Sequence, residues 1–178
     1  MNKQLVKSNI YLIGMMGSGK TTIGKLLAEK LDYRFFDTDD LVERFAQKTI
    51  SEIFATETEA KFRELESQVL EKLSADTKSV IAPSAPVTIA TGGGIVQRPK
   101  NWKYLRQGLI VWLDADLNLL NQRLEKDNNS RPNRSKLELL LQTRRPLYSQ
   151  ADIRIAIKPE QTPEEIAAQI IYFCQRSI

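Results

Sequence analysis

The segment with the clearest chemical meaning runs from Gly14 to Thr22 and reads Gly-Met-Met-Gly-Ser-Gly-Lys-Thr-Thr. It fits the phosphate-binding pattern GxxxxGK[ST], which ends here in Lys20 and Thr21. An apolar run precedes it and a helical pattern follows, so the motif has the strand–loop–helix setting that it requires. In that setting backbone N–H groups surround a β-phosphate, Lys20 reaches the β- and γ-phosphates, and the Thr21 hydroxyl binds Mg²⁺. A chance glycine turn is the alternative, and the full pattern favours a nucleoside triphosphate site.

Two carboxylates, Asp37 and Asp39, follow the second apolar run. Residues two apart point the same way in an extended segment. One carboxylate could therefore hold Mg²⁺ through water while the other faces an acceptor hydroxyl as base or orienting group. The alternative is an acidic helix cap, since a helical pattern begins at Asp39.

Three further segments carry groups that could bind an anionic ligand. The triple glycine 92–94 follows a strand pattern and allows close approach of a ligand, or forms a flexible turn. Arg63 flanks an apolar helical stripe three residues before Glu66, a spacing that by itself favours an exposed ion pair. Arg131 lies in a polar stretch that suits a lid over phosphates, or a plain surface loop. In the pair 144–145, an arginine could clamp a carboxylate or serve as a helix C-terminal charge.

Composition narrows the possible chemistry. The chain of 178 residues has no histidine, which excludes histidine general bases and histidine metal ligands. Its single cysteine, Cys174, permits no internal disulfide, so we expect a reducing, cytoplasmic setting. No apolar run approaches the roughly 20 residues of a membrane span. The net charge of +4 comes without a Lys/Arg block, which favours a small anionic ligand over nucleic acid.

The elements that must position these groups alternate between strand and helix. Strand patterns cover 9–14, 33–37, 87–91, 108–114 and 153–157. Helical patterns cover 20–31, 39–47, 51–55, 57–73, 117–126, 137–143 and 162–175. The alternation predicts one α/β domain over residues 1–178, a three-layer fold with a central parallel five-stranded sheet and helices on both faces. Ligands of such sheets bind at the carboxyl ends of the strands, where the phosphate loop, the two aspartates and the triple glycine fall.

Nearly the whole chain, from about residue 9 to 173, resembles the shikimate kinase family, in the nucleoside monophosphate kinase-like group of P-loop proteins. The shared segments are the phosphate loop, 36–39, 53–55, Phe62-Arg63 with Glu66, 91–94, Arg131-Pro132, and 144–148 with 151–152. The phosphate loop alone is generic, whereas these elements in this order are specific. Three departures are a lid that looks several residues shorter, Thr58 in place of the usual glycine, and an insertion over 83–86 of unassigned role.

The resemblance implies a role for each motif. It implies a substrate-binding helical segment at about 38–73 and a short lid at about 127–136. The catalytic residues would be Lys20, Asp39 and Arg131. The nucleotide would be held by Gly17, Ser18, Gly19, Lys20, Thr21, Thr22, Arg123, Arg131 and Pro163. Shikimate would be bound by Asp39, Arg63, Gly93, Gly94 and Arg144, with Phe54, Phe62 and Met16 around it. Thr21 and Asp37 would hold Mg²⁺.

The expected function is ATP-dependent phosphorylation of shikimate to shikimate 3-phosphate, in the chorismate pathway to aromatic amino acids. The resemblance implies a cytoplasmic monomer that binds ATP and shikimate, and neither nucleic acid nor membrane. Two alternatives are a related small-molecule kinase, such as a gluconate kinase, and a binding protein of the same fold with weak or lost activity. The arginines with the two aspartates argue against the first, and retention of Lys20, Asp39, Arg63 and Arg144 argues against the second.

Overall fold

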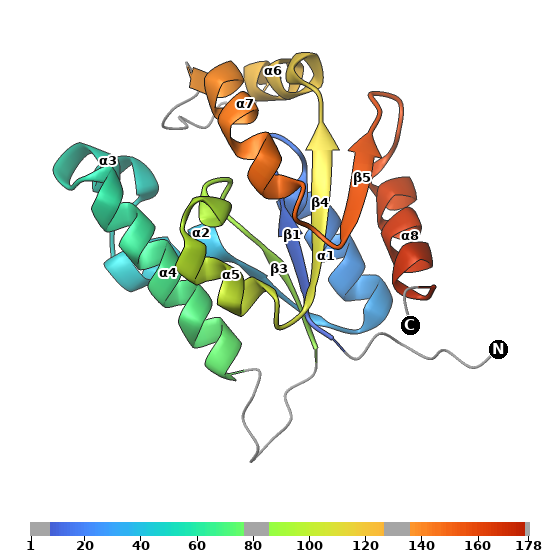
Figure 1. Ribbon diagram of the computed structural model, residues 1–178, viewed down its shortest axis with the longest axis horizontal. Coiled ribbons are helices and arrows are strands. Elements are labelled where there is room, and N and C mark those ends of the chain that lie inside the picture. Colours follow the sequence, from blue (N-terminus) through green and yellow to red (C-terminus); the bar gives the residue numbers. More distant parts are fainter. Residues whose placement is uncertain (1–7, 77–85, 127–135, 177–178) are drawn as a thin grey trace.

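A central five-stranded parallel sheet organises the molecule (Figure 1). The computed structural model describes residues 8–76, 86–126 and 136–176. The strands are β1 (Ile10–Ile13), β2 (Arg34–Asp37), β3 (Val87–Ala90), β4 (Leu109–Ala115) and β5 (Ile153–Ile157). They lie in the order β2-β3-β1-β4-β5, and every pairing is parallel. The prediction of a parallel five-stranded α/β fold is therefore confirmed.

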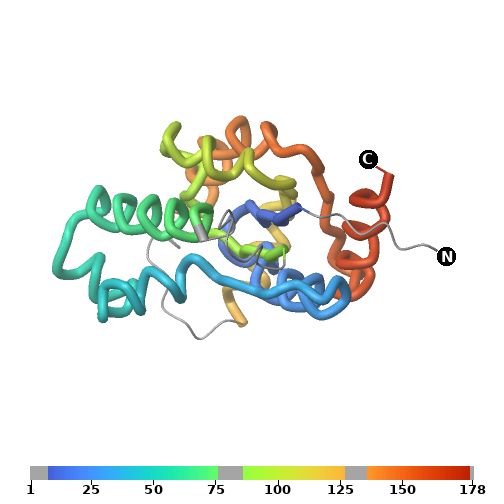
Figure 2. Tube along the Cα trace, turned by 90° about the horizontal axis from the view of Figure 1, so that it is seen from below, coloured from blue at the N-terminus to red at the C-terminus, as the bar shows by residue number. Residues whose placement is uncertain are grey.

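Helices cover both faces of this sheet, which completes the three layers. They are α1 (Lys20–Leu31), α2 (Thr38–Ala46), α3 (Ile50–Thr56), α4 (Glu59–Asp76), α5 (Pro99–Leu105), α6 (Leu117–Lys126), α7 (Leu137–Tyr148) and α8 (Pro163–Cys174). A 3-10 turn, η1 (Ile95–Gln97), precedes α5. Figures 1 and 2 show α1 and α8 together on one face and α5 on the other.

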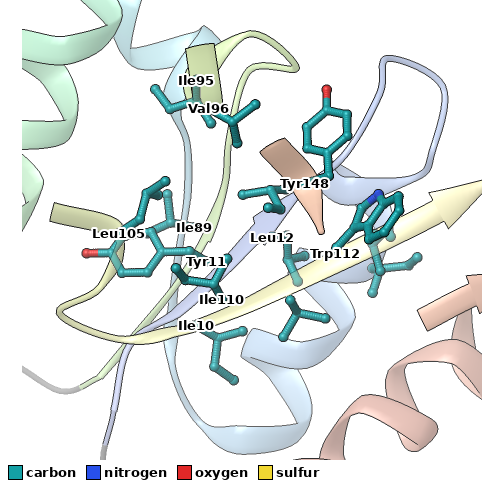
Figure 3. Close-up of a cluster of buried hydrophobic side chains, with 14 of the residues drawn as sticks. Ile10, Tyr11, Leu12, Ile89, Ile95, Val96, Leu105, Ile110, Trp112 and Tyr148 are labelled. Carbon is teal, nitrogen blue, oxygen red and sulfur yellow. The ribbon is translucent and has the colours of Figure 1, made fainter. Parts of the chain in front are cut away.

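The hydrophobic core is built around the buried strands of the sheet. All four residues of β1 and of β3 are buried, because both strands are interior and helices cover them on each side. Figure 3 shows Ile10, Leu12 and Ile89 packed with Leu105 of α5 and Tyr148 of α7. Strand β5 alternates buried and exposed residues, as expected for a strand at the edge of the sheet. No helix in the described ranges is long and apolar enough to cross a bilayer.

The predicted strands and helices are present in the structure, and the main differences concern α5 and the end of α7. Residues 99–105 form α5, which the sequence patterns did not predict because it is a single short helix beginning at a proline. Helix α7 continues to Tyr148, five residues beyond its predicted end, and it contains Pro146. Helix α8 begins with a capping box, in which Thr162 and Glu165 make reciprocal hydrogen bonds.

Helices α2, α3 and α4 lie beside the β2 edge of the sheet (Figure 1), over the range for which the resemblance implies substrate binding. The Thr49 and Glu52 side chains cap the start of α3 reciprocally. The Glu43 carboxylate of α2 accepts a hydrogen bond from the Ile50 backbone N–H and so joins α2 to α3. The lid predicted at about 127–136 falls outside the described residues except for its last position, and 83–85 of the insertion fall outside as well.

Candidate functional site

The phosphate loop leaves the carboxyl end of β1 and leads into α1. An added Cβ at Gly14, whose φ is +143°, would lie 2.6 Å from the Leu113 carbonyl oxygen, so only glycine fits there. The Lys20 ammonium donates to the Gly14 carbonyl at 2.9 Å and to the Met15 carbonyl at 2.8 Å. This places a cation over a loop of backbone N–H groups at a helix N-terminus, which is an arrangement for binding phosphate.

Asp37 ends β2 beside this loop and makes two contacts. One carboxylate oxygen accepts from the Thr21 hydroxyl at 2.7 Å, and the other accepts from the Asp39 backbone N–H at 3.0 Å. Asp37 is therefore the N-cap of α2 and also the hydrogen-bond partner of Thr21, the expected Mg²⁺ ligand. A role as helix cap is thus compatible with a role near the metal. The hydroxyl and the carboxylate are hard oxygen donors of the kind that Mg²⁺ prefers, alongside phosphates.

The triple glycine lies at the end of β3, between the other two strand ends. The Thr38 hydroxyl accepts from the Gly92 N–H at 2.8 Å, and the Thr91 hydroxyl donates to the Leu12 carbonyl at 2.9 Å. An added Cβ at Gly92 would lie 2.7 Å from Asp39 Oδ1 and closer still to Glu66 Oε1. Absence of a side chain at Gly92 thus lets two carboxylates approach the same loop.

Arg63 points from α4 into this site instead of into solvent. Its Nη1 donates to Glu66 at 2.6 Å and its Nη2 donates to Glu59 at 3.0 Å. Glu66 is only 1% exposed, so the pair expected on the surface is buried on its acidic side. Burial lowers the pKa of Arg63, but the two carboxylates outweigh it and the net shift is upward. Burial also raises the pKa of Glu66, against the opposing effect of Arg63 and Arg144.

Arg144 reaches the same loop from α7 on the other side. Its side chain is 2% exposed, and Nη2 donates to the Gln97 amide oxygen at 2.9 Å. Burial lowers the pKa of Arg144, an effect that Tyr148 opposes. The Tyr148 hydroxyl donates to the Gly93 carbonyl at 2.5 Å and so ties the end of α7 to the glycine loop.

Two cavities meet along the strand ends. The larger has a volume of about 620 Å³ and is lined by Asp39, Phe54, Phe62, Arg63, Glu66, the triple glycine and Arg144, among others. The smaller has a volume of about 380 Å³ and is lined by Gly17, Gly19, Lys20, Thr22, Arg123 and Pro163, among others. Both are lined by Met16, Thr21, Asp37, Asp39 and Gly93. A group transferred between two ligands would pass across this shared boundary.

The residues predicted around the nucleotide line the smaller cavity, except for Ser18 and Arg131. Arg123 of α6 donates to the carbonyls of Gly17 and Ser18, both at 3.3 Å, and Pro163 begins α8 on the same cavity. Ser18 is fully buried in the loop beneath it. Arg131 lies outside the described residues, so its predicted place over the phosphates stays a prediction.

Sequence patterns alone did not assign Thr38, Gln97 or Tyr148 to the site. Thr38 stands between two aspartates, and a hydroxyl at the start of a helix is more often a cap. Gln97 lies on a 3-10 turn without periodicity, and Tyr148 has the pattern of a core residue. The carboxylate of Glu66 was recognisable only as an ion-pair partner, although its position between Leu65 and Val69 was a sign of burial.

Comparisons with known proteins agree with this geometry. A sequence model of the family described as shikimate kinase matches residues 16–175. The chain is 53% identical to a shikimate kinase of Microcystis aeruginosa, over 92% of this chain and 84% of the relative. It is 52% identical to one of Rippkaea orientalis, over 95% of this chain and 89% of the relative.

Solved structures give the same picture. A shikimate kinase from Acinetobacter baumannii in complex with shikimate superposes with a TM-score of 0.83 at 34% identity, over 96% of this chain and 94% of that one. A gluconokinase from Sinorhizobium meliloti superposes with a TM-score of 0.62 at 17% identity, over 98% and 95% of the two chains. The second likeness extends to the fold alone.

Proposed function

The chain belongs to the shikimate kinase family and phosphorylates shikimate with ATP, and we propose that the two joined cavities are its substrate sites. ATP occupies the smaller cavity, with its phosphates on the loop 14–22, and shikimate occupies the larger one. The observation that carries this assignment is that Asp39 and Gly93 line both cavities, while two arginines flank the larger one. The acceptor hydroxyl and the γ-phosphate would then meet at the shared boundary.

We assign the shikimate carboxylate to Arg63 and Arg144. Both guanidiniums line the larger cavity and are held by hydrogen bonds, so little conformational entropy is lost when they bind an anion. Backbone groups of Gly93 and Gly94 would contact the ring, with Phe54 and Phe62 as an apolar wall whose ring centroids are 4.9 Å apart. Such a clamp fixes the orientation of the ring and hence which hydroxyl faces the nucleotide.

The transfer itself needs few groups. The 3-hydroxyl oxygen of shikimate forms a bond to the γ-phosphorus while the bond from that phosphorus to the β–γ bridging oxygen breaks, releasing ADP. Asp39 orients the hydroxyl and accepts its proton, and Lys20 turns from the loop carbonyls to the β- and γ-phosphates. Mg²⁺, held by Thr21 directly and by Asp37 through water, would offset the charge of the phosphates.

The remaining nucleotide contacts are assigned to residues of α6, the lid and α8. Arg123 and Pro163 would bracket the adenine at the open side of the smaller cavity, and Arg131 would close over the phosphates from the lid. We also propose a cytoplasmic monomer, consistent with a buried Cys174 that is the sole cysteine of the chain. The modest net charge of +4 supports small anionic ligands and offers nothing in favour of nucleic acid or membrane partners.

A coupled assay of ADP release tests the function. The purified protein is given ATP and Mg²⁺ with shikimate, with gluconate, or with no acceptor. We expect release only with shikimate, because gluconate lacks the ring that the clamp and the aromatic wall orient. Release that is independent of shikimate, or absent from a protein shown to be folded, would contradict the proposal.

A further inference from the structure

The two arginines of the proposed clamp are held by chemically different partners. Arg63 donates to two carboxylates, those of Glu59 and Glu66. Arg144 donates to a neutral amide oxygen, that of Gln97, and the described part of the chain offers no carboxylate within ion-pair distance of it. The positive charge of Arg63 is therefore directly paired with carboxylates, whereas Arg144 has no carboxylate partner in hydrogen-bond contact and interacts with Glu66 only at longer range.

Gln97 is itself on a fixed support. It ends the turn η1, and its backbone N–H donates to the Gly94 carbonyl at 3.0 Å. The carbonyls of the two preceding residues accept hydrogen bonds from α5, Ile95 from Asn101 at 2.7 Å and Val96 from Trp102 at 3.0 Å. The turn that carries Gln97 is thus held at both its glycine end and its helix side, so the backbone from which the Gln97 side chain reaches Arg144 has a defined position.

Besides Gln97, the Arg144 guanidinium also interacts with the Tyr148 side chain. An added Cβ at Gly93 would lie 3.6 Å from Nη1, so Nη1 lies beside a glycine that lines both cavities. The buried Nε has no hydrogen-bond partner. The positive charge of Arg144 and its Nη1 beside Gly93 can therefore serve a carboxylate in the cavity, whereas the enclosed Nε cannot reach one.

We propose that Gln97 is a positioning residue that orients the Arg144 guanidinium without neutralising it, and so sets the affinity of the site for the substrate carboxylate. The proposal rests on the proposed function, since it takes Arg144 as a ligand of the shikimate carboxylate. It places the specificity for an anionic acceptor in Gln97, an exposed residue of η1 that contacts Arg144 but does not line the larger cavity. A carboxylate at the same position would compete directly with the substrate for Arg144.

Two substitutions separate charge from orientation. Gln97→Glu keeps the acceptor and adds a negative charge, so the KM for shikimate should rise by about tenfold or more, with the KM for ATP unchanged. Gln97→Met keeps the length and removes the acceptor, so the same KM should rise only about threefold. The midpoint of thermal unfolding of Gln97→Glu should not fall below that of the wild type, because its carboxylate gains a buried cation as partner.

The control is Gln150→Glu, an equal change of charge at an exposed position just beyond α7. It should leave both KM values within about twofold of the wild type, since Gln150 has no described hydrogen bond to Arg144, whereas Gln97 accepts one from it, and a distant exposed charge is screened. Shikimate binding measured by calorimetry should follow the KM values. Unchanged shikimate affinity in Gln97→Glu would overturn the proposal, as would an equal loss of kcat, ATP affinity and stability in both Gln97 variants. A wild type without shikimate-dependent ADP release would instead refute the proposed function on which the inference rests.

Discussion

Replacing Gly94 by alanine should weaken shikimate binding mainly by displacing Arg63. A Cβ at Gly94 would lie 2.7 Å from Nη2 of Arg63 and closer still to Nη1 and Cζ. The backbone of Gly94 has φ −94° and ψ 0°, which any residue can adopt, so the substitution adds no backbone strain. The guanidinium must move instead, and it is the end of a flexible side chain.

The expected rise in the KM for shikimate follows from how far the Arg63 guanidinium must move to clear the new Cβ. Ordinary contacts of a Cβ begin at 3.4 Å, so the guanidinium must move away by about 1 Å. A misplacement of that size in a substrate-positioning group can lower catalytic efficiency on the order of 100-fold. The retreat also strains the 2.6 Å hydrogen bond to Glu66 that orients Arg63. We therefore expect the KM for shikimate to rise about 30- to 100-fold, with the KM for ATP nearly unchanged.

A double-mutant cycle isolates the cause. Initial rates of ADP release are measured over a range of shikimate for the wild type, Gly94→Ala, Arg63→Ala and the double variant. If the alanine acts by displacing Arg63, adding it to Arg63→Ala should change kcat/KM by less than about twofold. Additive losses in the cycle, or a wild-type KM in Gly94→Ala, would refute this reasoning. Thermal unfolding should show that every variant is folded.

Three further perturbations have defined outcomes. Lys20→Ala should abolish ADP release while the protein stays folded by circular dichroism, because the loop loses its cation toward the phosphates, and retained turnover would exclude the loop as the phosphate site. Thr38→Val removes the acceptor of the buried Gly92 N–H and should lower the free energy of unfolding by about 1–3 kcal/mol in urea titration; an unchanged midpoint would mean that this contact contributes nothing. Burial raises the pKa of Cys174 to about 11, so its thiol should react with iodoacetamide at pH 8 far more slowly in the native than in the unfolded protein, and equal rates would contradict its burial. The same shift means that the unfolded chain loses this proton first, so native stability should fall as the pH rises from about 9 toward 11, a fall that Cys174→Ala should lessen.

The parts of the fold that follow from local pattern were predictable. Strand β1, helix α1 and the capped helix α8 have periodicities and caps that depend on neighbouring residues only. Helix α5 was missed because it is short and begins at a proline; it is held by Asn101 and Trp102, which donate to carbonyls of η1 six residues earlier. The full length of α7 was missed for a similar reason, since Tyr148 is held by the sheet and by Gly93 despite the preceding proline.

Arg63 shows most clearly what a pattern cannot decide. Its spacing from Glu66 predicts an ion pair, and the pair is present. The spacing favoured an exposed pair of little consequence, and only the resemblance to the shikimate kinase family assigned the arginine to a substrate. The structure places the carboxylate under the triple glycine, because Gly92 has no side chain to keep Glu66 away.

The sequence by itself determined the phosphate loop, the five strands and most of the helices, and the resemblance to the shikimate kinase family, because a contiguous motif and a local period are independent of the rest of the chain. It could not determine the partners of Arg144, since Gln97 and Tyr148 come from separate elements whose approach depends on how α7 packs against the sheet. Tertiary structure alone decides which charges are neutralised inside the protein and which remain for a ligand. Coulomb energies depend on distance and burial, and neither quantity is encoded in any one segment.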